Sequence, residues 1–316
     1  MRVGRWILCF ILIGATGVYA QDAERKGTPP TLENVAYGPY ERNVLDFWKA
    51  ESDAPAPVLI FIHGGGFVGG NKRSVRGNVI VETCLEKGVS FAAINYRFRN
   101  TAPIQDILRD AARAVQFIRY NAEAWHVDPE RIASYGGSAG AGTSMWLAFH
   151  DDLADPDSED PVLRQSSRIV AAGSRNGQFS YDIFQWASVL GLPAENFYPR
   201  DVSFYGLATV DEAETEKGKQ IRADVDMRGL ITKDDPPVFL FCNHEGGMPQ
   251  NRGHYVHHPK HSIAIKERCD EAGVEVEMYL PKMGSPPPGN ANQAMLAFFF
   301  KHLNVGAGFP TRPSTD

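Results

Sequence analysis

Two short glycine-rich segments carry residue types suited to nucleophilic chemistry. Ser138 lies in Gly136-Gly137-Ser138-Ala139-Gly140, directly after the apolar run Ile132–Tyr135. A serine between small residues at a strand-to-helix turn can hold its hydroxyl out of a sheet. The second segment, His63-Gly64-Gly65-Gly66-Phe67, follows the apolar run Val58–Ile62, and its backbone N–H groups can point at a developing oxyanion. Either segment alone is a weak signal, but both in this order favour a serine nucleophile beside an oxyanion-binding loop.

Alternating apolar and amphipathic stretches predict the elements that position these segments. The predicted strands are Val58–Ile62, Ser90–Asn95, Ile132–Tyr135, Pro237–Cys242 and Val274–Leu280. The predicted helices are Ser74–Lys87, Pro103–Tyr120, Ala141–His150, His261–Ala272 and Asn290–Leu303. This alternation predicts an α/β protein with a doubly wound, mainly parallel sheet and helices on both faces. Between Gln178 and Ile231 the pattern breaks into short aromatic-rich pieces, which form either a cap over the site or an ordinary packed excursion.

The chain resembles the α/β-hydrolases of the hormone-sensitive-lipase and bacterial feruloyl-esterase and acetylesterase branch. The resemblance runs from about Asn34 to Leu303. It is carried by Leu45-Asp46-Phe47, His63–Phe67, Ala93–Arg97, Asp128–Ile132 and Gly136–Gly140. It implies the α/β-hydrolase fold with a small cap at about residues 178–231, Ser138 as nucleophile, and an oxyanion hole made by the N–H groups of Gly65, Gly66 and Ala139. We expect no cofactor.

The resemblance also predicts where a base and an acid should follow Ser138, and this chain departs from the pattern at both places. In the family the histidine follows the eighth strand, but the stretch from Pro281 to Asn290 contains no histidine. The acid should follow the seventh strand, about two residues before Val256-His257-His258-Pro259, where this chain has His254. Glu245 is the only carboxylate between Cys242 and His261, so it is a candidate acid or a solvated loop residue.

The stretch from His244 to His261 holds five of the nine histidines, and three interpretations follow. His254 or His257 could reach Ser138 as a relocated base. Alternatively, imidazoles three or four residues apart could converge on a transition metal, although Pro259 interrupts any helix through them. They could also have no common target.

The N-terminal residues predict export. Arg2 and Arg5 precede an apolar stretch from Trp6 to Val18, and Val18-Tyr19-Ala20 has small residues where signal peptidase cleaves. We therefore expect a signal peptide at residues 1–20 and one hydrolase domain at residues 21–316, secreted or periplasmic and not held at a membrane. The alternative is an uncleaved N-terminal anchor.

The charge and the cysteine content of the chain bear on its partners and on disulfide bonds. The formal charge of −6 with no basic run argues against a nucleic-acid partner. Cys9 leaves with the signal, and the odd number that remains, Cys84, Cys242 and Cys269, favours buried thiols over a disulfide framework.

These residues predict an exported serine hydrolase that cleaves carboxylic esters through a Ser138 acyl-enzyme. The resemblance suggests small acyl groups on plant or algal polysaccharide as the substrate class. The alternative, motivated by the altered histidine and acid positions, is a catalytically impaired hydrolase fold that binds a glycan or ester ligand without turning it over.

Overall fold

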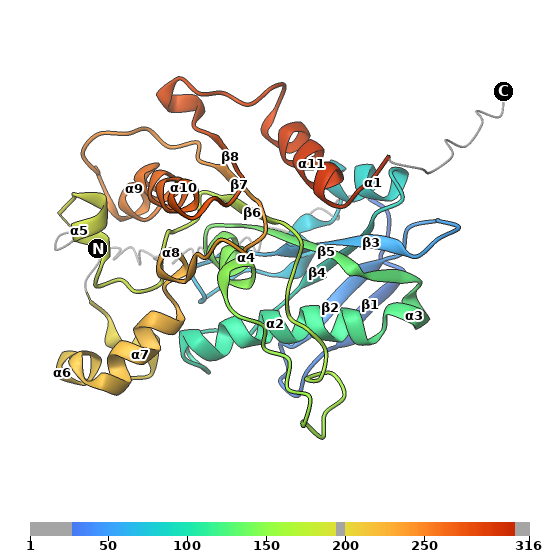
Figure 1. The fold of residues 1–316 in the computed structure, drawn as a ribbon, viewed down its shortest axis with the longest axis horizontal. Helices are drawn as coiled ribbons and strands as arrows, with labels where there is room; N and C mark the ends of the chain where they lie inside the picture. Colours follow the sequence, from blue (N-terminus) through green and yellow to red (C-terminus); the bar gives the residue numbers. More distant parts are fainter. Residues whose placement is uncertain (1–26, 194–199, 307–316) are drawn as a thin grey trace, which may run out of the picture.

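The computed structural model describes residues 27–193 and 200–306, so the predicted signal peptide lies outside the described residues. Within them the chain forms an eight-stranded sheet with the order β1-β2-β4-β3-β5-β6-β7-β8 (Figure 1). The strands are β1 Leu32–Ala36, β2 Val44–Trp48, β3 Ala56–Ile62, β4 Ser90–Ile94, β5 Val127–Gly137, β6 Ala172–Arg175, β7 Val238–Phe241 and β8 Val276–Tyr279. β2 pairs antiparallel with β1 and β4, and the other pairs are parallel. The predicted mainly parallel sheet is confirmed.

Helices cover both faces of the sheet and bury two hydrophobic layers. The α-helices are α1 Val79–Glu86, α2 Ile104–Tyr120, α3 Ala122–Trp125, α4 Ala139–Phe149, α5 Trp186–Leu190, α6 Val210–Glu214, α7 Glu216–Asp224, α8 Met227–Leu230, α9 Arg252–Val256, α10 Lys260–Ala272 and α11 Ala291–His302. Short 3₁₀ turns are η1 Lys72–Val75, η2 Val202–Tyr205 and η3 Pro281–Met283. Residues of α1 and α11 pack with one face of the strands, and residues of α2, α4 and α10 pack with the other.

Successive side chains of a central strand enter opposite hydrophobic layers, which explains why these strands are nearly all apolar. Val58, Ile60 and Ile62 of β3 enter the layer under α2 and α4, whereas Leu59 enters the layer under α1 and α11. A parallel strand buried on both faces has no polar side, so its sequence is a continuous apolar run. This is the signal that located β3, β4 and β5 in the sequence.

Several elements differ from the sequence prediction, which gave neither the N-terminal strands β1 and β2 nor the strand β6. The stretch predicted as one helix from Ser74 to Lys87 divides into η1 and α1, because Asn78 caps α1 by accepting a hydrogen bond from the Ile80 N–H at 3.1 Å. The four-residue strand β6, with the sequence Ala-Gly-Ser-Arg, was not predicted. Its sequence has neither an apolar run nor β-branched residues, and it lies between β5 and β7 in the sheet.

The described part of residues 178–231 connects β6 to β7 and carries α5, η2, α6, α7 and α8. It packs onto the loop after β3, since the Phe67 ring lies 5.2 Å from the Tyr181 ring and 5.9 Å from the Phe204 ring, centroid to centroid. The Tyr181 hydroxyl also donates to the Ala139 carbonyl at 2.5 Å. The segment therefore supports the elements around Ser138, and its assignment as a cap stays a prediction.

The three cysteines within the described residues, Cys84, Cys242 and Cys269, are free and buried. No helix among these residues combines the length and the apolar character needed to cross a bilayer.

Candidate active site

Ser138 occupies a strained turn between β5 and α4. Its backbone has φ 52° and ψ −118°, a pair of angles that residues other than glycine rarely adopt. Its N–H donates to the Arg175 carbonyl of β6 at 2.9 Å, and its carbonyl accepts from Ala141 and Gly142 in the first turn of α4. The turn leaves the hydroxyl partly exposed at the carboxyl edge of the sheet.

The glycine loop after β3 lies in direct backbone contact with this turn. A Cβ atom at Gly64 would come within 2.6 Å of the Gly137 carbonyl oxygen, and one at Gly140 within 2.0 Å of the Ile62 carbonyl oxygen. Side chains at these positions would therefore push the two segments apart. His63 fixes the start of the loop, because its ring stacks on Tyr96 and its carbonyl accepts from the Tyr96 hydroxyl at 2.7 Å.

Three N–H groups named from the sequence are available near Ser138. Ala139 is the first residue of α4, so its N–H has no acceptor within the helix. Gly65 and Gly66 have φ values of 116° and 60°, and their N–H groups donate to no acceptor among the described residues. The structure thus leaves these donors unpaired, as an oxyanion-binding role requires.

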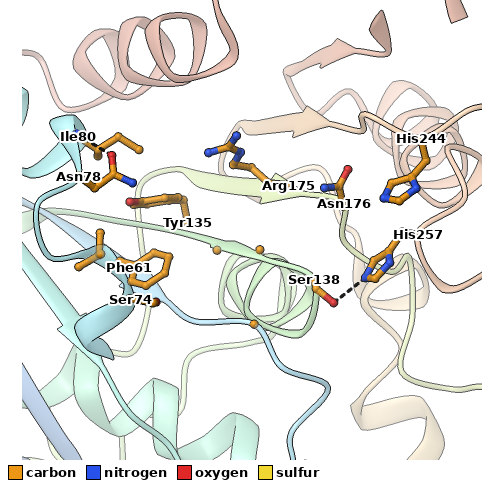
Figure 2. A pocket seen from close by; sticks show the side chains of 14 residues that line it. Phe61, Ser74, Asn78, Ile80, Tyr135, Ser138, Arg175, Asn176, His244 and His257 are labelled. Carbon is orange, nitrogen blue, oxygen red and sulfur yellow. Dashed lines mark hydrogen bonds between the residues drawn. The ribbon is translucent and has the colours of Figure 1, made fainter. Parts of the chain in front are cut away.

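The structure brings one of the two candidate histidines to Ser138. The Ser138 Oγ lies 2.8 Å from the Nε2 of His257, as the dashed line in Figure 2 marks. His257 directly follows the short helix α9, whose first turn is capped by the Asn251 side chain accepting from the His254 N–H at 2.9 Å. The Cys242 thiol at the end of β7 donates to the His257 carbonyl at 3.2 Å and so ties this turn to the sheet.

A backbone carbonyl sets the tautomer of His257. Its Nδ1 lies 3.0 Å from the Gly253 carbonyl oxygen, which can only accept, so Nδ1 carries the proton and Nε2 is free to accept from Ser138. Burial, with a smaller contribution from the neighbouring His244, lowers the pKa of His257 below its ordinary value. The imidazole is therefore neutral at neutral pH and can take a proton.

Glu245 and His254 lie away from this pair. The Glu245 side chain is 73% exposed and its carboxylate is 3.8 Å from the Lys282 ammonium group. His254 directs Nε2 at the Glu245 carbonyl oxygen, 2.7 Å away, and its Nδ1 accepts from the Gln250 N–H at 3.4 Å. The structure therefore does not bring Glu245 to His257, and the Gly253 carbonyl stands where an orienting carboxylate was expected.

His244 stacks beside His257 with the ring centroids 5.4 Å apart, whereas the last two histidines of this region contact backbone carbonyls. His258 contacts the Gly247 carbonyl at 3.0 Å, and His261 is buried against the Tyr255 carbonyl at 3.1 Å. Among the described residues, no three His, Cys, Asp or Glu side chains are grouped closely enough to hold a metal ion.

A cavity of about 410 Å³ opens beside Ser138. It lies over the ends of β3, β5 and β6, on the face covered by α1 and α11 (Figure 2). Its polar lining comes from Ser74, Asn78, Tyr135, Ser138, Arg175, Asn176, His244 and His257. None of the described residues between 178 and 231 lines it.

Comparisons with known proteins agree with this fold. The BD-FAE family model matches residues 45–186. The solved structure described as "Truncated form of carbohydrate esterase from gut microbiota" superposes with a TM-score of 0.67 at 19% identity, covering 89% of this chain and 99% of that one. The chain has the α/β-hydrolase fold. The resemblance and the fold class predicted from the sequence are thereby confirmed.

Two curated relatives of this chain carry the names of esterases. The protein named "Probable carboxylic ester hydrolase LipM" of Mycobacterium tuberculosis is 33% identical over 66% of this chain and 46% of its own length. The Arabidopsis thaliana protein named "Probable isoprenylcysteine alpha-carbonyl methylesterase ICMEL2" is 28% identical over 79% of this chain and 55% of its own length. The chain thus spans about half the length of these curated relatives.

Sequence reasoning missed the contribution of β6 to the site. Arg175, the last residue of this strand, and Asn176, which follows it, both line the cavity beside Ser138. The signal that could have located them is the position of β6 next to β5, because the carboxyl ends of neighbouring parallel strands share one edge of a sheet.

A buried histidine should make the stability of the protein depend on pH. Burial lowers the pKa of His261 to about 3, so the unfolded chain binds a proton near pH 6.5 that the folded protein does not. The stability that depends on a neutral His261 is fully present above the pKa of this residue in the unfolded chain. It is lost as the pH falls below that value. We expect His261 to contribute a slope of about 1.4 kcal/mol per pH unit between pH 6 and pH 4.

The measurement is urea unfolding of the wild type and of His261→Asn across this pH range. The variant is expected to be less stable at pH 7 but to lose less stability on acidification. If the free energy of unfolding changed equally with pH in the two proteins, His261 would not be the source of the pH dependence.

Proposed function

We propose that this α/β-hydrolase is a serine esterase that cleaves carboxylic esters with a Ser138–His257 pair. The observation that carries the proposal is the 2.8 Å contact between the Ser138 Oγ and the His257 Nε2, with Nδ1 held by a carbonyl. Nucleophile, base and orienting acceptor then form a chain of hydrogen bonds. The names of the curated relatives and of the solved carbohydrate esterase support ester hydrolysis.

In the proposed reaction the Ser138 proton passes to His257 Nε2 as Oγ bonds to the acyl carbon. The carbonyl oxygen of the ester becomes an oxyanion held by the N–H groups of Gly65, Gly66 and Ala139. Collapse of this intermediate breaks the bond to the alcohol, which leaves with the proton from Nε2. Water then attacks the acyl-enzyme by the same route, and the acid and free Ser138 are released.

The predicted signal peptide at residues 1–20 and the carbohydrate esterase neighbour favour an exported enzyme acting on acylated polysaccharide. Acetyl or feruloyl groups on plant or algal glycans are the substrate class proposed here. Export is tested by the N-terminal sequence of the protein recovered from the periplasm or the medium, which should begin at Gln21.

The test of the reaction is fluorophosphonate labelling together with hydrolysis of 4-nitrophenyl acetate by the wild type and Ser138→Ala. The wild type should be labelled on Ser138 and release 4-nitrophenol, and the variant should do neither. Thermal unfolding at the same temperature for both proteins shows that the variant is folded. Equal behaviour of the two proteins would overturn the serine mechanism.

A second candidate, a binding protein with the same cleft, is favoured by the absence of a carboxylate partner for His257 among the described residues. A carbonyl fixes the tautomer but supplies less stabilisation to the imidazolium that forms during attack than a carboxylate would. This candidate predicts that ligands bind equally to the wild type and to Ser138→Ala, with no release of acid from either.

The lowered pKa of His257 predicts the pH dependence of the reaction. The base must be neutral to accept the Ser138 proton, so activity is lost only when His257 becomes protonated. Because burial lowers its pKa, we expect kcat/KM to stay level from pH 8 down to about 6.5, the ordinary histidine value, and to fall below it. The measurement is the pH profile of kcat/KM for 4-nitrophenyl acetate, and an inflection above pH 7 would contradict it.

A further inference from the structure

We infer that the cavity beside Ser138 binds a carboxylate carried by the ester substrate, through the Arg175 guanidinium and the Tyr135 hydroxyl. The inference names the substrate class of the proposed esterase and rests on that function. Its basis is a group of hydrogen-bond donors at the cavity that includes a guanidinium without a counter-charge and a hydroxyl without a hydrogen-bond partner among the described residues.

Arg175 lies beside the nucleophile because β6 pairs with β5. It is the Cα partner of Gly137, and its carbonyl accepts from the Ser138 N–H. Its side chain lies on the face covered by α1 and α11, and Figure 2 shows the guanidinium directed toward Asn78, away from His257. The charge is therefore on the opposite side of the cavity from the catalytic pair.

No counter-charge compensates this guanidinium within the described residues. Its Nη1 donates to the Asn292 Oδ1 at 2.9 Å, and no described carboxylate oxygen lies within the 4.0 Å of an ion pair. The described lining of the cavity contains neither Asp nor Glu. A cation lining a cavity free of carboxylates favours an anionic ligand, and the planar fork of Arg suits a carboxylate.

Tyr135 supplies a second donor. Its side chain is 2% exposed and lines the cavity, and its hydroxyl has no hydrogen-bond partner among the described residues. Buried hydroxyls are normally paired, so an unpartnered one at a cavity wall points to a missing ligand group. Burial raises the pKa of Tyr135 well above its ordinary value, so the hydroxyl keeps its proton and can donate.

Asn78 completes the group. Its Oδ1 accepts from the Ile80 N–H as the cap of α1, which turns the amide nitrogen outward. Figure 2 shows this nitrogen on the cavity side, facing Arg175. A guanidinium, a phenol and an amide then present donors to one space.

The spacing places the carboxylate several bonds from the ester that reacts. Tyr135 precedes Ser138 by three residues in extended chain, which is roughly 10 Å. Either half of the substrate can span this length, so the acid group belongs either to a dicarboxylic acyl chain or to a uronic acid on the alcohol side. A second cavity of about 390 Å³ is lined by Asn292, which accepts the hydrogen bond from Arg175, and by Gln293 and Val79.

The experiment compares acidic and neutral esters that are otherwise matched. The acyl-side pair is 4-nitrophenyl hydrogen glutarate and 4-nitrophenyl methyl glutarate. The alcohol-side pair is the monoacetate of methyl glucuronoside and the monoacetate of methyl glucoside. The wild type is expected to favour the acid in one pair by about 10-fold or more in kcat/KM, the gain typical of a charged hydrogen bond. The pair that shows the preference identifies which half carries the carboxylate.

The variants separate this site from general charge effects. Arg175→Gln is expected to reduce the acidic-to-neutral ratio to near one. Tyr135→Phe should lower the same ratio without lowering the unfolding temperature, because its hydroxyl has no partner to lose. Lys282→Gln removes a cation that does not line the cavity, and should keep the wild-type ratio.

A binding measurement keeps the inference separate from the proposed function. Ser138→Ala cannot turn over an ester but keeps Arg175 and Tyr135, so calorimetry should show that it binds methyl glucuronoside or glutarate more tightly than methyl glucoside or dimethyl glutarate. Lack of any preference for the acid, in both turnover and binding, would overturn the inference even if the esterase reaction is observed. A preference unchanged by Arg175→Gln would also overturn it.

Discussion

Replacing His257 by glutamine is expected to lower kcat/KM for 4-nitrophenyl acetate by about a thousandfold or more, the loss typical when a catalytic serine loses its base. The physical reason is that the Ser138 Oγ–H has one side-chain acceptor within hydrogen-bond distance among the described residues, the His257 Nε2. Without it no side chain takes the proton during attack, and a neutral serine hydroxyl is a poor nucleophile. The measurement is steady-state hydrolysis at pH 7.5.

The chain offers a matched control for this prediction in His254, three residues earlier. It is a histidine of the same turn with its Nε2 at the Glu245 carbonyl, so His254→Gln should change kcat/KM by less than about threefold. Glu245→Gln should be similarly mild, because that carboxylate is exposed and contacts Lys282. If His254→Gln were the damaging substitution, the base would be assigned to the wrong histidine.

The contrast between these two histidines shows how far the sequence could determine the site. The sequence places both histidines in one loop after β7, but residues three apart on a helix point about 60° away from each other. Which of them faces Ser138 depends on how the short helix α9 is oriented. Asn251 at its start and the Cys242 contact at its end fix that orientation, and the second of these joins residues of different elements.

The sheet and the turn that carries Ser138 could be predicted more readily from the sequence. β3 is a long apolar run and β5 ends in the short buried run Ile132–Tyr135, and glycines follow both, so local pattern alone gives the strand cores and the turn. β6 lacks such a pattern, and Arg175 reaches Ser138 only through strand pairing across the sheet. The residues that the sequence could not assign are therefore those brought to the site by non-local contacts.

Substituting Gly140 by alanine is expected to lower the free energy of unfolding by about 3 kcal/mol, the upper part of the range for overpacking in a core. The new Cβ would lie 2.0 Å from the Ile62 carbonyl oxygen and 2.6 Å from that of His63, so backbone has to move. Movement of His63 carries the Gly65 and Gly66 N–H groups away from Ser138. A displacement of this kind, near 1 Å, lowers kcat by about a hundredfold.

Gly137 is the matched control because it lies in the same turn and a Cβ there meets no atom within 4 Å. Its φ is not positive, so alanine fits its backbone, and Gly137→Ala should change the free energy of unfolding by less than about 1 kcal/mol. Urea unfolding of both variants, with fluorophosphonate labelling of the folded protein, measures the two effects separately. Equal stability of the two variants would show that the contact between the glycine loop and the turn at Ser138 can relax without a loss of stability. Close backbone packing would then not be what holds the oxyanion donors in place.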